Sequence, residues 1–306
     1  MADEFRGERL LDPTVLASIG RLDLIARTIA EGFLIGSHQS PYHGLSQEFA
    51  EHRPYIAGDE LRRIDWRVYA RTDRLYVKEF EEETNAPVRL LLDVSGSLAY
   101  APRGNNVGKL DYARYLAASL AYLANRQNDR VGLTCFADEV RTRLAARGGK
   151  KQLYAILAAL DAQQASNQAH IGEVLLREAA LWKRRGLALI ISDLYDEPEE
   201  IVGAVARVRR ARHDVIIFHL IDRAEKLLEY NGLHEFRDLE TNETLMVDAG
   251  RVREGYRKRL AELCAFYARE FERAGADYAQ LDTALPLDRA LAVYLRRRRA
   301  SGGLRA

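Results

Sequence analysis

The stretch Arg89–Tyr100, RLLLDVSGSLAY, begins as an apolar strand and ends in polar side chains. Its apolar residues are consecutive rather than alternating, which is typical of a strand buried on both faces of a parallel sheet. Asp93 follows them directly, and the hydroxyls of Ser95 and Ser97 come next at alternate positions. A carboxylate and two hydroxyls at the tip of a buried strand predict a polar site at that edge of the sheet.

A regular alternation of apolar strands and amphipathic helices follows this stretch. We expect strands at 88–92, 131–136, 140–144, 187–192, 215–221 and 278–281, the third of them on an edge. We expect helices at 110–126, 150–160, 171–184, 198–212 and 252–274, and a closing helix that ends in Arg296–Arg299. Helices between strands that are apolar throughout form right-handed crossovers over a parallel sheet. The sequence therefore predicts an α/β fold with a doubly wound, mostly parallel sheet flanked by helices.

Two segments precede this alternation. Residues 13–35 have helical apolar spacing, with Asp12 and Pro13 as cap and first-turn residue. Residues 49–84 are irregular, strand-like and rich in charge. Because Ala86-Pro87 marks a boundary, we expect an N-terminal part, residues 1–86, with a helix and a small β-rich addition, and an α/β domain, residues 87–306.

The α/β domain is expected to carry a hairpin near its end. Residues 234–248, HEFRDLETNETLMVD, alternate as two short strands around a polar turn, with Thr241-Asn242 near that turn. This hairpin and the helices after it complete the predicted domain.

The composition is that of a globular protein without a marked charge. Lys and Arg number 46, Asp and Glu 45, and the net charge is +1, whereas nucleic-acid-binding domains carry a basic excess. The start, MADEFRGERLL, lacks the pattern of a secretory signal, and no apolar run approaches the roughly 20 residues that span a bilayer. Cys135 and Cys264 lie in apolar runs and predict buried thiols in a reducing compartment. We therefore expect a cytoplasmic protein without membrane insertion or a nucleic-acid partner.

A second acidic strand end predicts a cation site. Asp193 follows the apolar strand LALIIS, as Asp93 follows its own strand. Ligands of an open α/β sheet bind at the carboxyl ends of its strands, so both carboxylates and the hydroxyls of Ser95 and Ser97 are expected to face one crevice. Such oxygen donors suit Mg²⁺, Mn²⁺ or Ca²⁺. The alternative is that Asp93 and Ser95 only cap the turn that follows.

The strand-tip motif and the charged segment before it resemble known families. DVSGS after a first buried strand, with an Asp ending a later strand, is similar to the metal-ion-dependent adhesion site (MIDAS) of von Willebrand factor A domains. EFAEHRPYIAGDELRRIDWRVYAR resembles the signature of a bacterial family, domain of unknown function 58, in which this string precedes a von Willebrand A-like core. The matching positions are Arg53, Tyr55, Gly58, Asp59, Arg62, Ile64, Asp65, Trp66, Ala70 and Arg71. The hairpin and DYAQLDTALPLDRALAVYLRRR also resemble that family, so the likeness covers nearly the whole chain.

The resemblance implies a von Willebrand A-like, Rossmann-like fold and a protein-binding function without catalysis. It implies that Asp93, Ser95 and Ser97 hold a cation directly. Asp193 would hold it directly or through water, and an acidic side chain of a client protein would complete the shell. The implied partners are MoxR-type AAA+ ATPases, which act with von Willebrand A proteins in assembly or maturation of other proteins.

One loop departs from the family pattern. Where the adhesion site takes a threonine hydroxyl, this chain reads SNQAHIGEVLL, with Ala169 or His170 at the expected position and Ser166 slightly upstream. Alanine offers no ligand, and histidine suits transition metals better than magnesium. The metal site is therefore expected to be weak, to include an extra water or to be degenerate.

The signature segment has two interpretations. Its charged residues form either an ion-pair lattice that docks the segment onto the core or a face that binds a partner. Candidate pairs for the lattice are Asp59–Arg62 and Asp65–Arg71. The residues concerned are Arg53, Tyr55, Asp59, Arg62, Asp65, Trp66 and Arg71.

Other functions for the crevice stay open. A metal-dependent hydrolase or phosphotransferase would use Asp93 or Ser95 as its nucleophile, and a scaffold would carry a degenerate ion site. Residues 104–110, GNNVGKL, have a partial likeness to a phosphate-binding loop. The string is one residue short and ends in Leu110, which has no hydroxyl for magnesium.

Overall fold

The computed structural model describes residues 20–39, 52–55, 64, 66–78, 86–101 and 107–302 of the 306-residue chain. The chain divides into two compact units, residues 1–33 with 85–295, and residues 34–84 with 296–306. The first unit holds the α/β sheet and the second holds the signature segment.

The first unit is built on a six-stranded sheet. Its strands are β3 (Val88–Asp93), β4 (Val131–Phe136), β5 (Val140–Arg147), β6 (Leu187–Ser192), β7 (Asp214–Ile221) and β10 (Asp277–Asp282). The order is β10-β7-β6-β3-β4-β5, and all neighbours are parallel except β4 and β5. Counted along the chain, this is the order 3-2-1-4-5-6 of a doubly wound fold. The predicted fold class and the antiparallel edge strand are confirmed.

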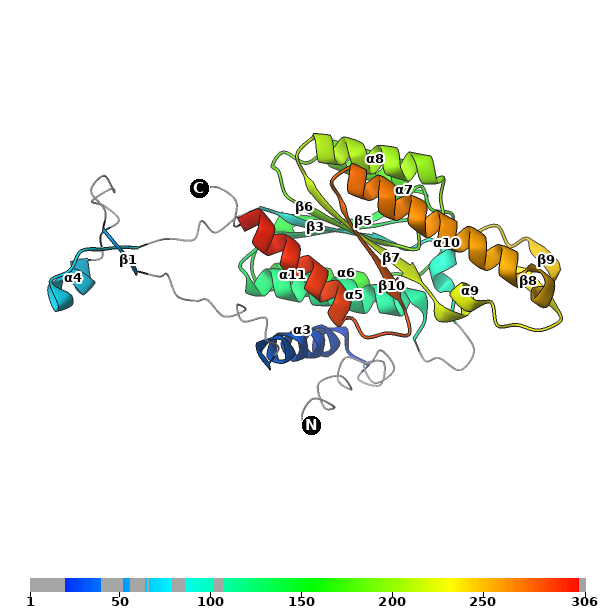
Figure 1. Ribbon diagram of the computed structural model, residues 1–306, viewed down its shortest axis with the longest axis horizontal. Helices are drawn as coiled ribbons and strands as arrows, with labels where there is room; N and C mark the ends of the chain where they lie inside the picture. The colour runs from blue at the N-terminus through cyan, green and yellow to red at the C-terminus, as the bar shows by residue number, and fades with distance from the viewer. Residues whose placement is uncertain are drawn as a thin grey trace. The chain divides into compact units, whose positions relative to one another are not determined.

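Helices cover both faces of the sheet (Figure 1). One face carries α5 (Lys109–Arg126), α6 (Lys150–Asp161) and α11 (Asp288–Gly302), and the other carries α7 (Ile171–Ala180), α8 (Pro198–Arg210) and α10 (Ala249–Arg273). β3, β4 and β6 are buried along almost their whole length, because helices remove both faces from water. The core on the second face includes Leu91, Ile190, Ile217, Val205 and Phe271.

One helix ends earlier than the sequence predicts. The periodicity of residues 171–184 suggests a single helix, but α7 stops at Ala180. Trp182 lies beyond its end, and the Arg89 guanidinium lies 4.7 Å from the centre of its ring. This contact between distant residues is a cation–π interaction, which local helical spacing does not reveal.

The first described helix belongs to the α/β unit for most of its length. α3 (Leu22–Gln39) buries Ile25, Ala26, Ile29 and Ala30, and Tyr122 of α5 donates a hydrogen bond to its Glu31 at 3.1 Å. The unit boundary falls after Phe33. The structure therefore groups this helix with the sheet, whereas the predicted division at residue 86 grouped it with the signature segment.

The signature segment contains little described structure. β1 (His52–Pro54) pairs antiparallel with β2 (Tyr76–Lys78), and α4 (Trp66–Thr72) lies between them in the chain. Trp66 is 58% exposed and stacks edge-on against Tyr69. Arg71 is exposed and Tyr55 is half-buried. Asp59, Arg62 and Asp65 lie outside the described residues, and so do the candidate pairs Asp59–Arg62 and Asp65–Arg71.

The predicted hairpin is present, with β8 (Leu233–Arg237) antiparallel to β9 (Thr244–Asp248). Asn242 takes the left-handed conformation in its turn, as the sequence indicates. Of the two cysteines, Cys135 is buried as predicted, but Cys264 is half-buried. The reason is that most residues of α10, which carries Cys264, face solvent.

Candidate functional site

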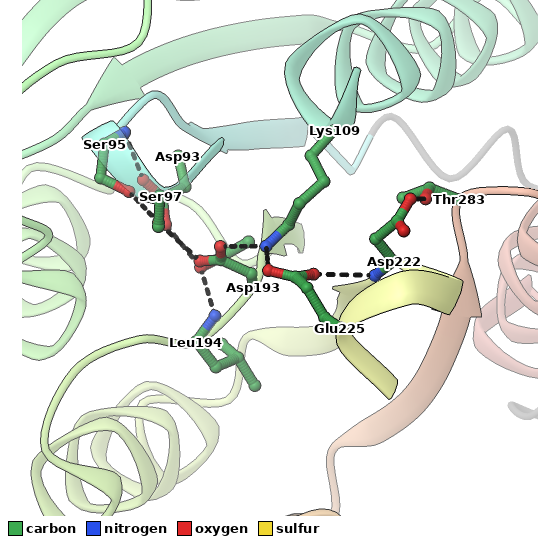
Figure 2. Close-up of polar contacts among 10 residues, drawn as sticks. Asp93, Ser95, Ser97, Lys109, Asp193, Leu194, Asp222, Glu225 and Thr283 are labelled. Carbon is green, nitrogen blue, oxygen red and sulfur yellow. Dashed lines mark hydrogen bonds and ion pairs between the residues drawn. The ribbon is translucent and has the colours of Figure 1, made fainter. Parts of the chain in front are cut away.

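The tips of two neighbouring strands form a polar cluster at the switch point of the sheet. β3 and β6 lie side by side where the strand order reverses, and both end at the same edge. Ser97 Oγ lies 3.1 Å from Ser95 Oγ and donates to Asp193 Oδ1 at 3.2 Å. Figure 2 shows these side chains pointing toward one another. The sequence prediction that Asp93, Ser95, Ser97 and Asp193 share one site is consistent with this geometry.

Asp93 is an internal anchor of this cluster. It is fully buried, accepts from Ser95 N–H at 2.8 Å, and accepts from Ser192 Oγ at 2.6 Å. Burial, with the nearby negative charge of Asp193, raises the pKa of Asp93 to about 7, although hydrogen bonds from Ser192 and Ser95 oppose the rise. Oδ1 of Asp93 therefore holds the serine loop through Ser95, as the capping alternative expects, and Oδ2 ties the end of β3 to Ser192 at the end of β6.

A buried lysine that was not among the predicted site residues lies next to Asp193. Lys109, the first residue of α5, is 1% exposed. Its ammonium donates to Asp193 Oδ2 at 2.6 Å and to Glu225 Oε1 at 3.0 Å. Burial acts to lower the pKa of Lys109, but the two carboxylates outweigh burial and raise it. A buried charge needs such partners, so Lys109 stays protonated.

The polar network continues to the ends of two further strands. Asp222, just after β7, caps the short helix α9 (Arg223–Leu227), and Glu225 of that helix accepts from the Asp222 backbone N–H at 2.9 Å. Asp222 also accepts from Thr283 Oγ1 at 2.5 Å, and Thr283 follows β10. The tips of β3, β6, β7 and β10 are thereby connected through one chain of polar contacts (Figure 2).

The turn of the β8–β9 hairpin lies directly on the serine loop. The short 3₁₀ helix η2 (Gly96–Ala99) carries Ser97, and a Cβ on Gly96 would clash with the Leu239 carbonyl and lie 3.2 Å from Glu240 Cα. The close approach of two backbones explains why this position is a glycine. Glu240 Oε1 is buried, with no hydrogen-bond partner in the described part of the chain. Burial raises the pKa of Glu240; Asp193 adds to the rise, and Ser97 partly opposes it.

The loop expected to supply a third ligand contributes backbone contacts instead. Asn167 C=O accepts from Gly96 N–H at 2.7 Å, and Ser166 N–H donates to Val94 C=O at 3.0 Å. Ala169 is buried, and His170 is exposed at the start of α7. Ser166 Oγ accepts from Arg141 at 2.7 Å. The loop therefore supports the serines, and its only nearby hydroxyl already has a partner.

The donor set combines oxygens that suit a hard cation with one competing positive charge. Hydroxyl and carboxylate oxygens of Ser95, Ser97 and Asp193 converge, and such oxygens suit Mg²⁺ or Mn²⁺. The buried, unpartnered oxygen of Glu240 also fits a cation. Lys109, however, already takes the second oxygen of Asp193. Among the described residues no group of three His, Cys, Asp or Glu could hold a metal, so a cation here would depend on the serines.

Comparison with known proteins gives a family and several distant likenesses. The family model described as "Protein of unknown function DUF58" matches residues 51–264. The uncharacterized proteins Rv1480 of Mycobacterium tuberculosis and Mb1516 of Mycobacterium bovis are each 27% identical over 282 residues, which cover 89% of this chain and 86% of theirs.

Solved structures are similar at low identity. The conserved hypothetical protein BatB from Bacteroides thetaiotaomicron is 16% identical, with a TM-score of 0.47 over 69% of this chain and 98% of its own. The SpRpn10 VWA domain is 11% identical, with a TM-score of 0.43 over 68% of this chain and 93% of its own. Among the helices in the described ranges, none is both long and apolar enough to traverse a bilayer.

Proposed function

This chain belongs to the DUF58 family of proteins of unknown function, and we propose that it is a non-enzymatic protein-interaction module assisted by a divalent cation. Ser95, Ser97 and Asp193 would hold Mg²⁺, Mn²⁺ or Ca²⁺, while Asp93 fixes the serine loop. The bound ion would supply a positive centre that attracts an acidic side chain of a client protein. The module would work in the cytoplasm.

One observation carries this proposal: the Ser97 hydroxyl bridges the tips of β3 and β6 by meeting Asp193 at 3.2 Å. The surrounding charges support it. Asp93, Asp193, Glu225 and Glu240 contribute four carboxyl groups, whereas Lys109 contributes one ammonium. Burial raises the pKa values of Asp93, Glu225 and Glu240. A divalent cation would relieve this excess of negative charge.

The partner is proposed from the family resemblance alone. A MoxR-type AAA+ ATPase would act with this protein in assembling or maturing a client. The exposed Trp66 and Tyr69 of α4 offer aromatic contact area of the kind that dominates interface hot spots. They suit a partner-binding role for the signature segment.

We favour binding over catalysis in this crevice because the candidate nucleophiles are enclosed. Asp93 and Ser95 are both fully buried, and both oxygens of Asp93 accept hydrogen bonds. A nucleophile must be able to reach its substrate, which the enclosed side chains of Asp93 and Ser95 cannot do in this conformation. Turnover of a generic phosphate ester, abolished by Asp93→Ala, would contradict this choice.

Two measurements test the proposed function. Isothermal titration of Mg²⁺ and Mn²⁺ is expected to show one site in the wild type and none in Ser97→Ala. Thr244→Ala, which removes an exposed hydroxyl from β9, should leave binding unchanged. Capture of a purified MoxR-type ATPase in Mg²⁺ is expected to be lost in EDTA. Capture that survives EDTA would contradict the cation-dependent mechanism.

A further inference from the structure

The β8–β9 hairpin turn supplies a carboxylate to the cluster at the strand tips. Glu240 lies in that turn. The turn approaches Gly96, the residue before Ser97, so closely that a Cβ added to Gly96 would lie 3.2 Å from the Cα of Glu240. Glu240 Oε1 is enclosed and has no hydrogen-bond partner among the described residues, whereas hydrogen bonds from Ser97 to the carboxylate partly oppose the rise that burial causes in its pKa. A buried carboxylate oxygen without a donor is costly, so its place beside Ser97 and Asp193 needs an explanation.

The hairpin turn is built to hold Glu240 in this position. The Asp238 carboxylate accepts from the backbone N–H of Glu240 at 2.7 Å and of Thr241 at 3.1 Å. Asp238 N–H in turn donates to the Glu243 carbonyl at 2.8 Å. The conformation of the turn is therefore fixed from within, and Glu240 does not contribute its own carboxylate to these contacts.

The base of the hairpin is also fixed relative to the serine loop. The hydroxyl of Tyr230, shortly before β8, lies 3.2 Å from the hydroxyl of Tyr100, the residue that follows η2. Arg253 of α10 donates to the carbonyls of Leu228 and Tyr230 at 3.0 and 2.6 Å. These contacts set the hairpin over the site independently of Glu240.

We propose that Glu240 is an internal ligand of the cation site, occupying the place that an acidic client side chain would take. This inference rests on the proposed function and deepens it. The loop around Ala169 contributes no side-chain oxygen to the cluster, and the hairpin turn contributes one. The site is thus closed by the protein's own carboxylate, and a client must displace Glu240 to reach the ion.

Mn²⁺ binding, followed by the loss of the electron paramagnetic resonance signal of free Mn²⁺, tests the proposal. Glu240→Gln should weaken binding about tenfold or more, since even outer-shell changes cost a metal site that much. Glu243→Gln, an exposed carboxylate of the same turn, should bind as the wild type does. Glu240→Ala should also bind weakly and should regain affinity when acetate is added, because acetate can enter the space left by the side chain.

The outcomes separate this inference from the proposed function. Wild-type affinity in Glu240→Gln, together with loss of binding in Ser97→Ala, would overturn the role of Glu240 and leave the cation site in place. Absence of Mn²⁺ binding in the wild type would overturn both. Circular dichroism of each variant establishes that weakened binding does not come from unfolding.

Discussion

The ammonium of Lys109 lies 2.6 Å from Asp193 Oδ2, and both side chains are enclosed by the protein. Lys109 begins α5 and Asp193 follows β6, so this ion pair joins a helix to a strand tip 84 residues further along the chain. It also leaves Asp193 only one oxygen, Oδ1, toward the serines. Any cation at the serines therefore binds next to a charge that the protein already supplies.

Removing the ammonium is expected to destabilise the α/β unit. Lys109→Met leaves the Asp193 carboxylate without its cation in a buried site, and breaking such a pair costs about 3–5 kcal/mol in the free energy of unfolding. Lys150→Met makes the same substitution at the exposed first residue of α6 and should change it by less than about 0.5 kcal/mol. Urea denaturation measures both, and equal stabilities of the two variants would contradict the importance of this pair.

The raised pKa of Asp93 predicts a pH dependence of stability. Its pKa is about 7 in the folded protein and 3.8 ordinarily, so the folded state holds the proton more tightly between these values. The stabilisation is complete below the ordinary pKa and is lost as pH rises through 7. In EDTA, the wild type should lose stability relative to Asp93→Asn by on the order of 1 kcal/mol per pH unit between pH 5 and 7.

Thermal unfolding of the wild type and Asp93→Asn across pH 5–8 measures this difference. The two curves should run parallel above about pH 7, where Asp93 is ionised in both states. Curves that already run parallel between pH 5 and 7 would contradict the prediction, because they would mean that Asp93 is ionised in the folded protein throughout this range.

Gly96→Ala is expected to push the hairpin turn off the serine loop. The added Cβ meets the backbone of Leu239, which cannot give way as a flexible side chain would. Hydrogen exchange should therefore accelerate at the amide of residue 96, which is buried against the turn and donates to the Asn167 carbonyl. Gly203→Ala, in α8 with open space around it, should leave the exchange unchanged. Unaltered exchange in Gly96→Ala would place the turn away from η2 in solution.

The grouping of α3 with the sheet predicts that its buried face stabilises the α/β unit. Ile29 is fully buried, and Ile29→Ala should lower the free energy of unfolding by about 2–5 kcal/mol. Leu24, on the same helix, is 42% exposed, and Leu24→Ala should cost less than about 1 kcal/mol. Urea denaturation, in which the sheet should unfold in a single transition, measures the free energy of unfolding of both variants. Equal small effects of the two substitutions would mean that α3 does not pack on the α/β unit in solution.

Much of the fold and half of the candidate site could be predicted from local patterns. Uninterrupted apolar strands require helices on both faces of the sheet, which indicates the α/β fold class. The carboxyl ends of parallel strands also meet at one edge of the sheet. Asp93 and Asp193 could therefore be placed together without a structure. The polar side chains that directly follow each apolar strand are the sequence feature that indicates this placement.

The rest of the site depends on contacts between distant segments. Lys109 belongs to the GNNVGKL string, which has a partial likeness to a phosphate-binding loop. That likeness does not indicate that its lysine is buried against carboxylates. Its partner Glu225 lies 116 residues away. Glu240 could not be found from the sequence either, because a hairpin predicts its own turn and not the surface on which that turn rests.

Crystals grown with Mn²⁺ test the central claim most directly, through the anomalous signal of the metal. The account predicts one peak bonded to the oxygens of Ser95, Ser97 and Asp193, with the Lys109 ammonium still paired to the other oxygen of Asp193. Density without a peak at the serines, at a Mn²⁺ concentration that saturates exposed sites, would contradict the claim. Lys109 would then be the only cation that this cluster binds.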